Sequence, residues 1–436
     1  MEKNILSVII LISGLFIGYG IGNVMTPTKT IIETKTVLVT KLPLDGKTIK
    51  IGDIAANSNG FQTEQSLIQL LIPDLNKYTK LLGYNVKFEF LIDEANGQNT
   101  IHLERVKAFR HMSVNLIIGG RWTAQASASL QYINQNKMLL FSPSSTSPIL
   151  SIPNDYLFRM CSDDTVQAPV ISSMLRDWGI KAVIVIMRND TWASDIYNIF
   201  EKDFTKRGGI VVDKICYKGE TIDFSGYLQN AENKAREAII EYGAEHVGIE
   251  VLCFEESAFI FQQAENFPTI YGLRWFGSDG TALSQSSINI SPKQASHLVV
   301  FSTKVAPAPG EKYNNLSTIY ELKTGRPFDY FSACVYDIAT IMMQAVLTTQ
   351  DDATINADKI IPLIEPLAYS QRGASGWNKL NTNGDRAESN YDIYGFVLND
   401  GMGDHQKFGF YNHETETIIW DTNGLNSIGL KVIGGS

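Results

Sequence analysis

The chain has 436 residues, more than one ordinary hydrophobic core accommodates, so two domains are expected. Hydrophobic residues make up 44% and charged residues 19%, the mix of a globular protein, which excludes a disordered chain. The formal net charge is -9, and because an acidic surface repels phosphate backbones, we do not expect a nucleic-acid partner.

The N-terminal segment predicts the compartment. No charged residue occurs between Lys3 and Lys29, and the apolar run over residues 5–21 approaches the ~20 residues that span a bilayer. The run is long for a signal-peptide core, and no convincing cleavage site follows it. We therefore expect an uncleaved transmembrane anchor over residues 1–25, rather than a removed signal, and a Thr- and Lys-rich stalk over 26–48. The folded part is then expected on the extracytoplasmic face of the cell membrane.

Strands and helices then alternate along the chain. The first set comprises the strand Thr48–Ala55, helix Gln62–Leu82, strand Val86–Ile92, helix Ile101–His111, strand Val114–Ile118, helix Thr123–Asn136 and strand Met138–Ser142. Pro73 falls inside the first helix and is expected to kink it or to reset its first turn. The alternation is typical of a parallel sheet with helices on both faces.

The same rhythm restarts further along. The second set comprises the helix Val166–Trp178, strand Ala182–Met187, helix Ala193–Lys206, strand Val211–Tyr217, helix Tyr227–Tyr242, strand His246–Cys253, helix Ser257–Ala264 and strand Arg274–Gly277. The remaining elements are a returning strand His297–Lys304, a long helix Tyr330–Thr348, and two hairpins that pair Gly376–Leu380 with Tyr391–Leu398 and Lys407–Tyr411 with Thr417–Asp421.

These elements predict an α/β fold of two doubly wound lobes joined by several crossings of the chain. Lobe 1 is expected to hold residues 49–165 plus 304–371, and lobe 2 residues 166–303 plus 372–436, with crossings near residues 165, 301 and 372. In open α/β sheets ligands bind beyond the carboxyl ends of the strands, which places one ligand between the lobes.

Motifs for catalysis and metal binding are missing. There is no HExxH, no GxSxG and no Walker loop, and the six histidines never fall four residues apart. The four cysteines match no zinc spacing, and buried thiols are favoured over one possible disulfide. We therefore expect no metal, no cofactor and no enzymatic activity.

Hydroxyl-rich stretches follow two of the predicted strands. Residues 119–123 (GGRWT) follow one, and residues 142–148 (SPSSTSP) follow the other. Hydroxyls and free backbone N–H groups at helix N-termini can seat a carboxylate, although plain N-capping would explain the same residues.

Six segments, taken in order, resemble the leucine/isoleucine/valine-binding protein family, the type I periplasmic-type solute-binding proteins of ABC importers. They are LIIGGRWT, MLLFSPSSTSP, YLFRMCSDDTVQA, VIVIMRNDTWASD, RWFGSDG and GWNKLNTNGDRAESNYDIYGFV, and the similarity as a whole runs from about Thr48 to about Asp400. The resemblance implies the two-lobed fold with a hinged cleft. It also implies capture of a small polar solute, most simply an amino acid, and delivery to ABC permease subunits.

The resemblance also implies a ligand site. Thr123, Ser144 and Thr146 would meet a ligand carboxylate, Trp192 would close over the ligand, and Asp279 would pair with an α-ammonium. Phe254 or Glu255 would add one further contact. On the residues alone, Asp279 is equally well a turn residue and Trp192 a core residue.

Departures from the family pattern leave the ligand open. Arg121 and Trp122 bring bulk to a loop that is small in typical members, and Arg121 could reach an anionic ligand side chain. Trp192 and Ala193 replace the usual Tyr and Gly. Urea or a short amide is the alternative ligand, and a sensory ectodomain is the alternative role.

Overall fold

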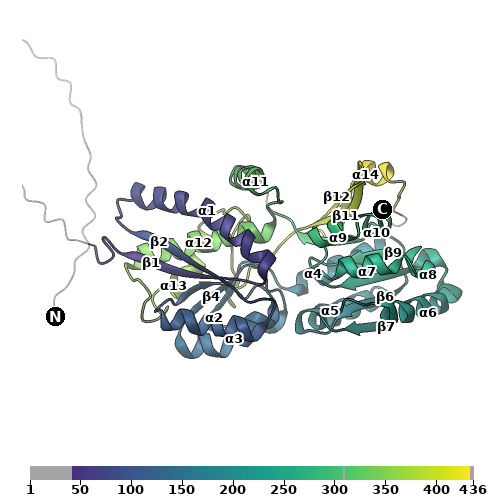
Figure 1. Ribbon diagram of the computed structural model, residues 1–436, viewed down its shortest axis with the longest axis horizontal. Helices are drawn as coiled ribbons and strands as arrows, with labels where there is room; N and C mark the ends of the chain where they lie inside the picture. The colour runs from purple at the N-terminus through teal and green to yellow at the C-terminus, as the bar shows by residue number, and fades with distance from the viewer. Residues whose placement is uncertain (1–41, 308–309, 433–436) are drawn as a thin grey trace, which may run out of the picture. The chain divides into compact units, whose positions relative to one another are not determined.

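Two separate β-sheets organise the protein in the computed structural model, which describes residues 42–307 and 310–432 (Figure 1). The residues from Leu42 onward form one unit that contains both sheets. The predicted membrane anchor (1–25) and most of the predicted stalk (26–48) lie outside the described residues. Each sheet forms the centre of one α/β lobe.

The sheet of lobe 1 has five parallel strands in the order β2-β1-β3-β4-β5. Its elements are β1 (Thr48–Ala55), α1 (Ser58–Leu81), β2 (Lys87–Glu94), α2 (Asn99–His111), β3 (Leu116–Ile118), α3 (Thr123–Asn136), β4 (Leu139–Ser142), η1 (Pro148–Leu150), β5 (Leu157–Arg159), α11 (Glu311–Thr324), α12 (Tyr330–Thr349) and α13 (Ile361–Tyr369).

Two apolar layers cover the faces of this sheet. Apolar residues of α1, α12 and α13 pack on one face, with Ile49 and Ile51 of β1, and those of α2 and α3 pack on the other, with Ile54. The alternation along β1 therefore feeds both layers. Figure 1 shows the late helices α12 and α13, drawn in green, within this otherwise purple and blue lobe.

The helix α12 is the one helix of the described ranges long and apolar enough to cross a bilayer, with a mean hydropathy of 1.4. The protein itself buries 78% of its apolar window, as expected of a core helix.

The sheet of lobe 2 has eight strands in the order β13-β12-β11-β10-β9-β8-β6-β7, parallel from β7 to β10 and antiparallel from β10 to β13. Its elements are α4 (Asp164–Asp177), β6 (Ala182–Arg188), α5 (Thr191–Lys206), β7 (Ile210–Tyr217), α6 (Ser225–Tyr242), η2 (Ala244–His246), β8 (Val247–Leu252), α7 (Ser257–Ala264), α8 (Pro268–Tyr271), β9 (Arg274–Gly277), α9 (Gln285–Ile290), α10 (Pro292–Leu298), β10 (Phe301–Val305), β11 (Tyr391–Asn399), β12 (Met402–Asn412), β13 (Thr417–Trp420) and α14 (Thr422–Ser427).

The chain passes between the lobes after β5, after β10 and before β11. The last passage lies beyond the predicted residue 372, because Ala374 and Leu380 still pack in the core of lobe 1. The predicted hairpin of Lys407–Tyr411 with Thr417–Asp421 is confirmed as the pair β12–β13.

The other predicted hairpin is wrong. Both edges of β11 are taken, one by β10 and one by β12, so no edge is left for residues 376–380. The carboxylate of Asp337 on α12 accepts the N–H groups of Ala374 and Ser375 at 2.7 and 2.8 Å. A buried side chain thus satisfies the backbone N–H groups of the two residues just before the predicted strand.

Two further boundaries differ from the prediction. The returning strand begins at Phe301, and His297 belongs to α10. The helix α1 starts at Ser58 and runs through Pro73 to Leu81 without a new start. The Asn57 side chain caps it by accepting the Gly60 N–H, a capping signal that the sequence contained.

A buried carboxyl lies on the inner strand β8. Glu250 is fully buried, and neither of its carboxylate oxygens has a hydrogen-bond partner among the described residues. Burial alone raises the pKa of this carboxyl well above its usual value of 4.5. The folded protein therefore favours the protonated acid.

We expect the variant Glu250→Gln to gain stability over the wild type as pH rises. Above pH 4.5 the unfolded carboxyl ionises while the folded one keeps its proton, so the wild type loses about 1.4 kcal/mol per pH unit until the folded carboxyl also ionises. Urea unfolding, followed by tryptophan fluorescence, should show the difference widening by up to about 3 kcal/mol between about pH 5 and pH 7.5. The exposed Glu237→Gln on α6 serves as the control. A pH-independent difference would contradict the expectation.

Candidate ligand-binding site

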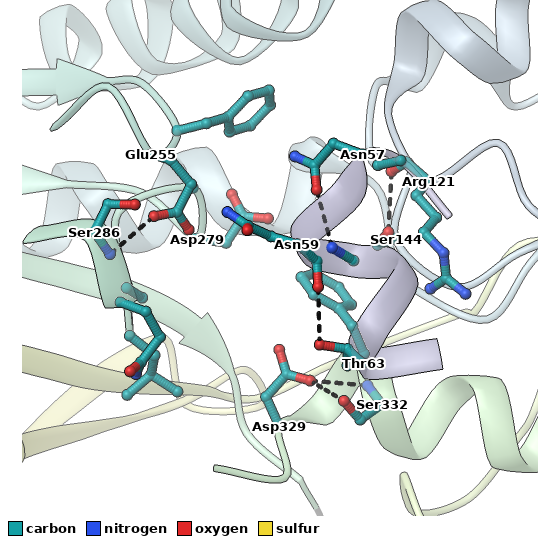
Figure 2. A pocket seen from close by; sticks show the side chains of 18 of the residues that line it. Asn57, Asn59, Thr63, Arg121, Ser144, Glu255, Asp279, Ser286, Asp329 and Ser332 are labelled. Atoms are coloured by element: carbon teal, nitrogen blue, oxygen red, sulfur yellow. Dashed lines mark hydrogen bonds between the residues drawn. The ribbon is translucent and has the colours of Figure 1, made fainter. Parts of the chain in front are cut away.

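A cavity of about 520 Å³ lies between the lobes, at the carboxyl ends of their parallel strands. Figure 2 shows it lined from both sides. Lobe 1 contributes Ala56, Asn57, Asn59, Gly60, Thr63, Arg121, Trp122, Thr123, Ser144, Tyr320, Arg326, Pro327, Asp329, Phe331 and Ser332. Lobe 2 contributes Trp192, Phe254, Glu255, Asp279, Gly280, Ala282, Leu283, Gln285, Ser286, Asn289 and Lys304.

The structure brings six of the seven predicted site residues to this cavity, namely Arg121, Thr123, Ser144, Trp192, Phe254 and Asp279. Thr146 is buried and is not part of the lining; its carbonyl accepts the Asp164 N–H at 2.8 Å. That the six bind a ligand stays a prediction.

The start of α3 forms one wall. The backbone turns at Gly120, which has a φ of +64° and would bring a Cβ to 3.0 Å from Ala126. The Gly120 N–H donates to His102 Nε2 at 2.8 Å. His102 Nδ1 therefore carries the ring hydrogen and faces Ser129 Oγ, and burial, followed by the nearby Arg121, lowers the pKa of His102 to about 3. The neutral imidazole of His102 therefore holds the turn at Gly120 through this hydrogen bond.

Beyond the turn, the first N–H groups of α3 have no side-chain cap, because the N-cap residue is Trp122. An uncapped helix start favours an anion through its free donors and its dipole. The Thr123 hydroxyl accepts the Ser147 N–H at 3.4 Å and keeps its own hydrogen for a ligand. The Ser144 hydroxyl instead donates to the Arg121 carbonyl at 3.0 Å, so it can only accept while that bond stands.

Arg121 does not offer its charge to the cavity. Its Nη2 lies 2.7 Å from Glu64 Oε2 and 3.2 Å from Asp53 Oδ1, and the side chain is buried. Burial raises the pKa of both carboxyls, against the opposing effect of Arg121. Two carboxylates therefore already balance the charge of the guanidinium, and its contact with an anionic ligand side chain stays a prediction.

Asp279 lies in the loop after β9 and, unlike Arg121, presents a charged group that has no ion-pair partner in the part of the chain that the structure describes. Its N–H donates to Gln167 Oε1 at 3.0 Å, whereas its Oδ1 is buried without a hydrogen-bond partner. Burial raises the pKa of this carboxyl, and Lys304 opposes the rise. The Gln167 amide also donates to Asp164 Oδ1 at 3.1 Å, which holds the loop in place. An unpartnered acceptor at the cavity wall fits a cationic ligand group.

Aromatic rings close one end of the cleft. Phe254 stacks on Trp192 of its own lobe at 4.5 Å between ring centroids and on Trp122 of lobe 1 at 5.2 Å. A hydrogen bond from the Ser147 hydroxyl to Asp195 also joins the lobes. The lobes therefore touch directly along this end.

The prediction missed two parts of the lining. The first is the start of α1, with Asn57, Asn59 and Thr63, because the leucine periodicity placed that helix four residues late. The second is the ion pair between Lys304 and Asp329 at 3.3 Å. Burial alone would raise the pKa of Asp329, but Lys304 and the donors of Ser332 outweigh it and hold the pKa below its usual value. The two residues of this ion pair belong to different lobes, so no local sequence pattern could predict it.

No group of His, Cys, Asp and Glu side chains able to hold a metal ion occurs in the described ranges. The four cysteines are free thiols, and three of them are buried.

Residues 68–399 match the family model of the receptor family ligand binding region. The chain belongs to this family. An uncharacterized protein of Methanocaldococcus jannaschii is 25% identical over 391 residues, which cover 85% of this chain and 91% of that protein.

Two solved structures share the fold. The leucine-binding protein LivK of Thermotoga maritima aligns with a TM-score of 0.69 at 19% identity, over 86% of this chain and 99% of LivK. The substrate-binding protein LivJ of Streptococcus pneumoniae, in complex with isoleucine, aligns with a TM-score of 0.67 at 18% identity, over 83% of this chain and 99% of LivJ. The predicted resemblance and the two-lobed fold of type I periplasmic solute-binding proteins are confirmed, and the matched solved structures are solute-binding proteins rather than enzymes.

Proposed function

We propose that this protein captures an amino acid between its lobes and delivers it to an ABC importer. One observation carries the proposal: an uncapped helix start and a buried, unpartnered carboxylate oxygen line the same cavity. The α-carboxylate would meet the start of α3 and the Thr123 hydroxyl, and the α-ammonium would meet Asp279 Oδ1. That LivJ was solved with isoleucine supports an amino acid as the ligand class.

The hinge and the tether complete the proposed role. Three chain passages let the lobes close on a ligand. The apolar run over residues 5–21 would anchor the protein, so that the lobes stay close to permease subunits on the extracytoplasmic face.

A thermal-shift screen of the full-length protein in detergent tests the ligand class. The twenty amino acids, urea and short amides are compared at millimolar concentration. A ligand at 100 times its Kd stabilises by ~2.7 kcal/mol, so one or more amino acids should raise Tm by several degrees. Matched analogues without the α-ammonium or the α-carboxylate serve as controls and should have no effect. A rise with urea or amides alone would replace the amino acid by the alternative ligand, and no rise with any compound would contradict the proposal.

A further inference from the structure

The lobe 2 wall of the cavity carries two carboxylates. Asp279 is the first, and Glu255, directly after Phe254 of the aromatic stack, is the second. In Figure 2 both side chains reach into the cavity from the lobe 2 side. Glu255 Oε2 accepts the Ser284 hydroxyl at 3.0 Å and the Ser286 N–H at 3.1 Å. These bonds fix the carboxylate and leave Oε1 for a ligand.

Neither carboxylate has an ion-pair partner among the described residues. The cation of the lobe 2 lining, Lys304, pairs with Asp329 at 3.3 Å. Outside the lining, Arg188 lies over the Phe254 ring at 4.2 Å, but Asp190 and Glu256 match its charge. The lobe 2 wall therefore keeps two negative charges to be matched.

The lobe 1 wall has the opposite character. The helix α1 starts there, and α3 starts there without a cap. Arg326 also lines this side and donates to Thr63 Oγ1 and Gln62 Oε1 at 3.1 and 2.9 Å, which are neutral partners. The buried charge of Arg121 is more than matched by Asp53 and Glu64. One wall thus favours an anion and the other favours two cations.

We propose that the ligand is an amino acid with a cationic side chain, such as arginine, lysine or ornithine. This inference rests on the proposed function. The carboxylate would face lobe 1, the α-ammonium would meet Asp279, and the side-chain cation would meet Glu255, with its stem along Phe254 and Trp192. An amino acid with a neutral side chain would leave Glu255 without a counter-charge, so it would lack the charge-assisted contact that a cationic side chain makes.

Pairs of ligands that differ in charge but hardly in shape test the inference. Calorimetry should find arginine at least about tenfold tighter than citrulline, and lysine at least about tenfold tighter than norleucine, which is ~1.4 kcal/mol. Glu255→Gln should remove most of that preference while citrulline binding stays within about twofold. Glu245→Gln, an exposed residue of η2 away from the cavity, is the matched control. The preference should also shrink in high salt, because Glu255 is exposed.

The outcomes separate the two proposals. If citrulline and norleucine bind as tightly as their charged counterparts, the cationic ligand is overturned while amino-acid binding stands. If no amino acid binds, both fail together. The ratios measured on the wild type alone decide the first question, so a Glu255 variant that fails to fold does not obstruct the test.

Discussion

The variant Asp279→Asn is expected to bind the amino-acid ligand about 30- to 4,000-fold more weakly, a loss of ~2–5 kcal/mol. The carboxylate oxygen Oδ1 has no partner in the protein, so the ligand ammonium would be its first charged partner. An amide in its place presents no charge to that ammonium. Calorimetry with the ligand that gives the largest thermal shift measures the loss.

Three comparisons show that the loss belongs to this contact. Asp213→Asn, on the edge strand β7 away from the cavity, should leave the Kd unchanged. A ligand analogue without the α-ammonium should not distinguish Asp279→Asn from the wild type. Because burial raises the pKa of Asp279, wild-type affinity should also rise with pH through the titration of this group, and the variant should lack that rise. An unchanged Kd would exclude the assigned role.

Arg121→Met is expected to destabilise lobe 1 by ~3–5 kcal/mol near neutral pH, because it leaves Asp53 and Glu64 buried without their counter-charge. Both carboxyls already have raised pKa values through burial, and loss of Arg121 raises them further. In the folded variant they hold protons that the unfolded chain releases. The destabilisation should therefore shrink as pH falls toward the usual carboxyl pKa values. Urea unfolding with circular dichroism, at about pH 5 and pH 7.5, measures both effects.

Two matched variants complete this experiment. Arg105→Met removes a partly exposed guanidinium from α2 that pairs with the partly exposed Asp93, and it should cost less than about 1 kcal/mol. The triple variant Asp53→Asn, Glu64→Gln, Arg121→Met removes all three buried charges and should recover most of the lost stability. If Arg121→Met alone costs less than about 1 kcal/mol at both pH values, Arg121 does not compensate the buried charges of Asp53 and Glu64.

Local sequence patterns were sufficient for most of the fold. The predicted bounds of β1, α3, α7 and β9 coincide with the structure. The family resemblance predicted Thr123 and Asp279 as site residues, and the structure brings both to one cavity at the carboxyl ends of the parallel strands.

What the sequence did not predict depends on contacts between distant residues. The ion pair of Arg121 was not predicted, because its partner Asp53 lies 68 residues away. Residues 376–380 do not form the predicted strand, because β12 and β10, which lies far earlier in the chain, already take both edges of β11. Lys304 and Asp329 were missed for the same reason. The periodicity of apolar residues indicates only on which face of a helix or strand a residue lies. It therefore cannot predict ion pairs or hydrogen bonds between residues that are distant in the sequence.

The late position of α12 in the chain has a consequence for biosynthesis. The five strands of lobe 1 are complete at Arg159, yet the helix that covers one of their faces ends at Thr349. At ~5–20 residues per second, a ribosome needs about 10–40 s to supply it. Throughout that interval the apolar layer on this side of the nascent sheet lacks a complete α12, so a holding chaperone has a defined window in which to engage the growing polypeptide.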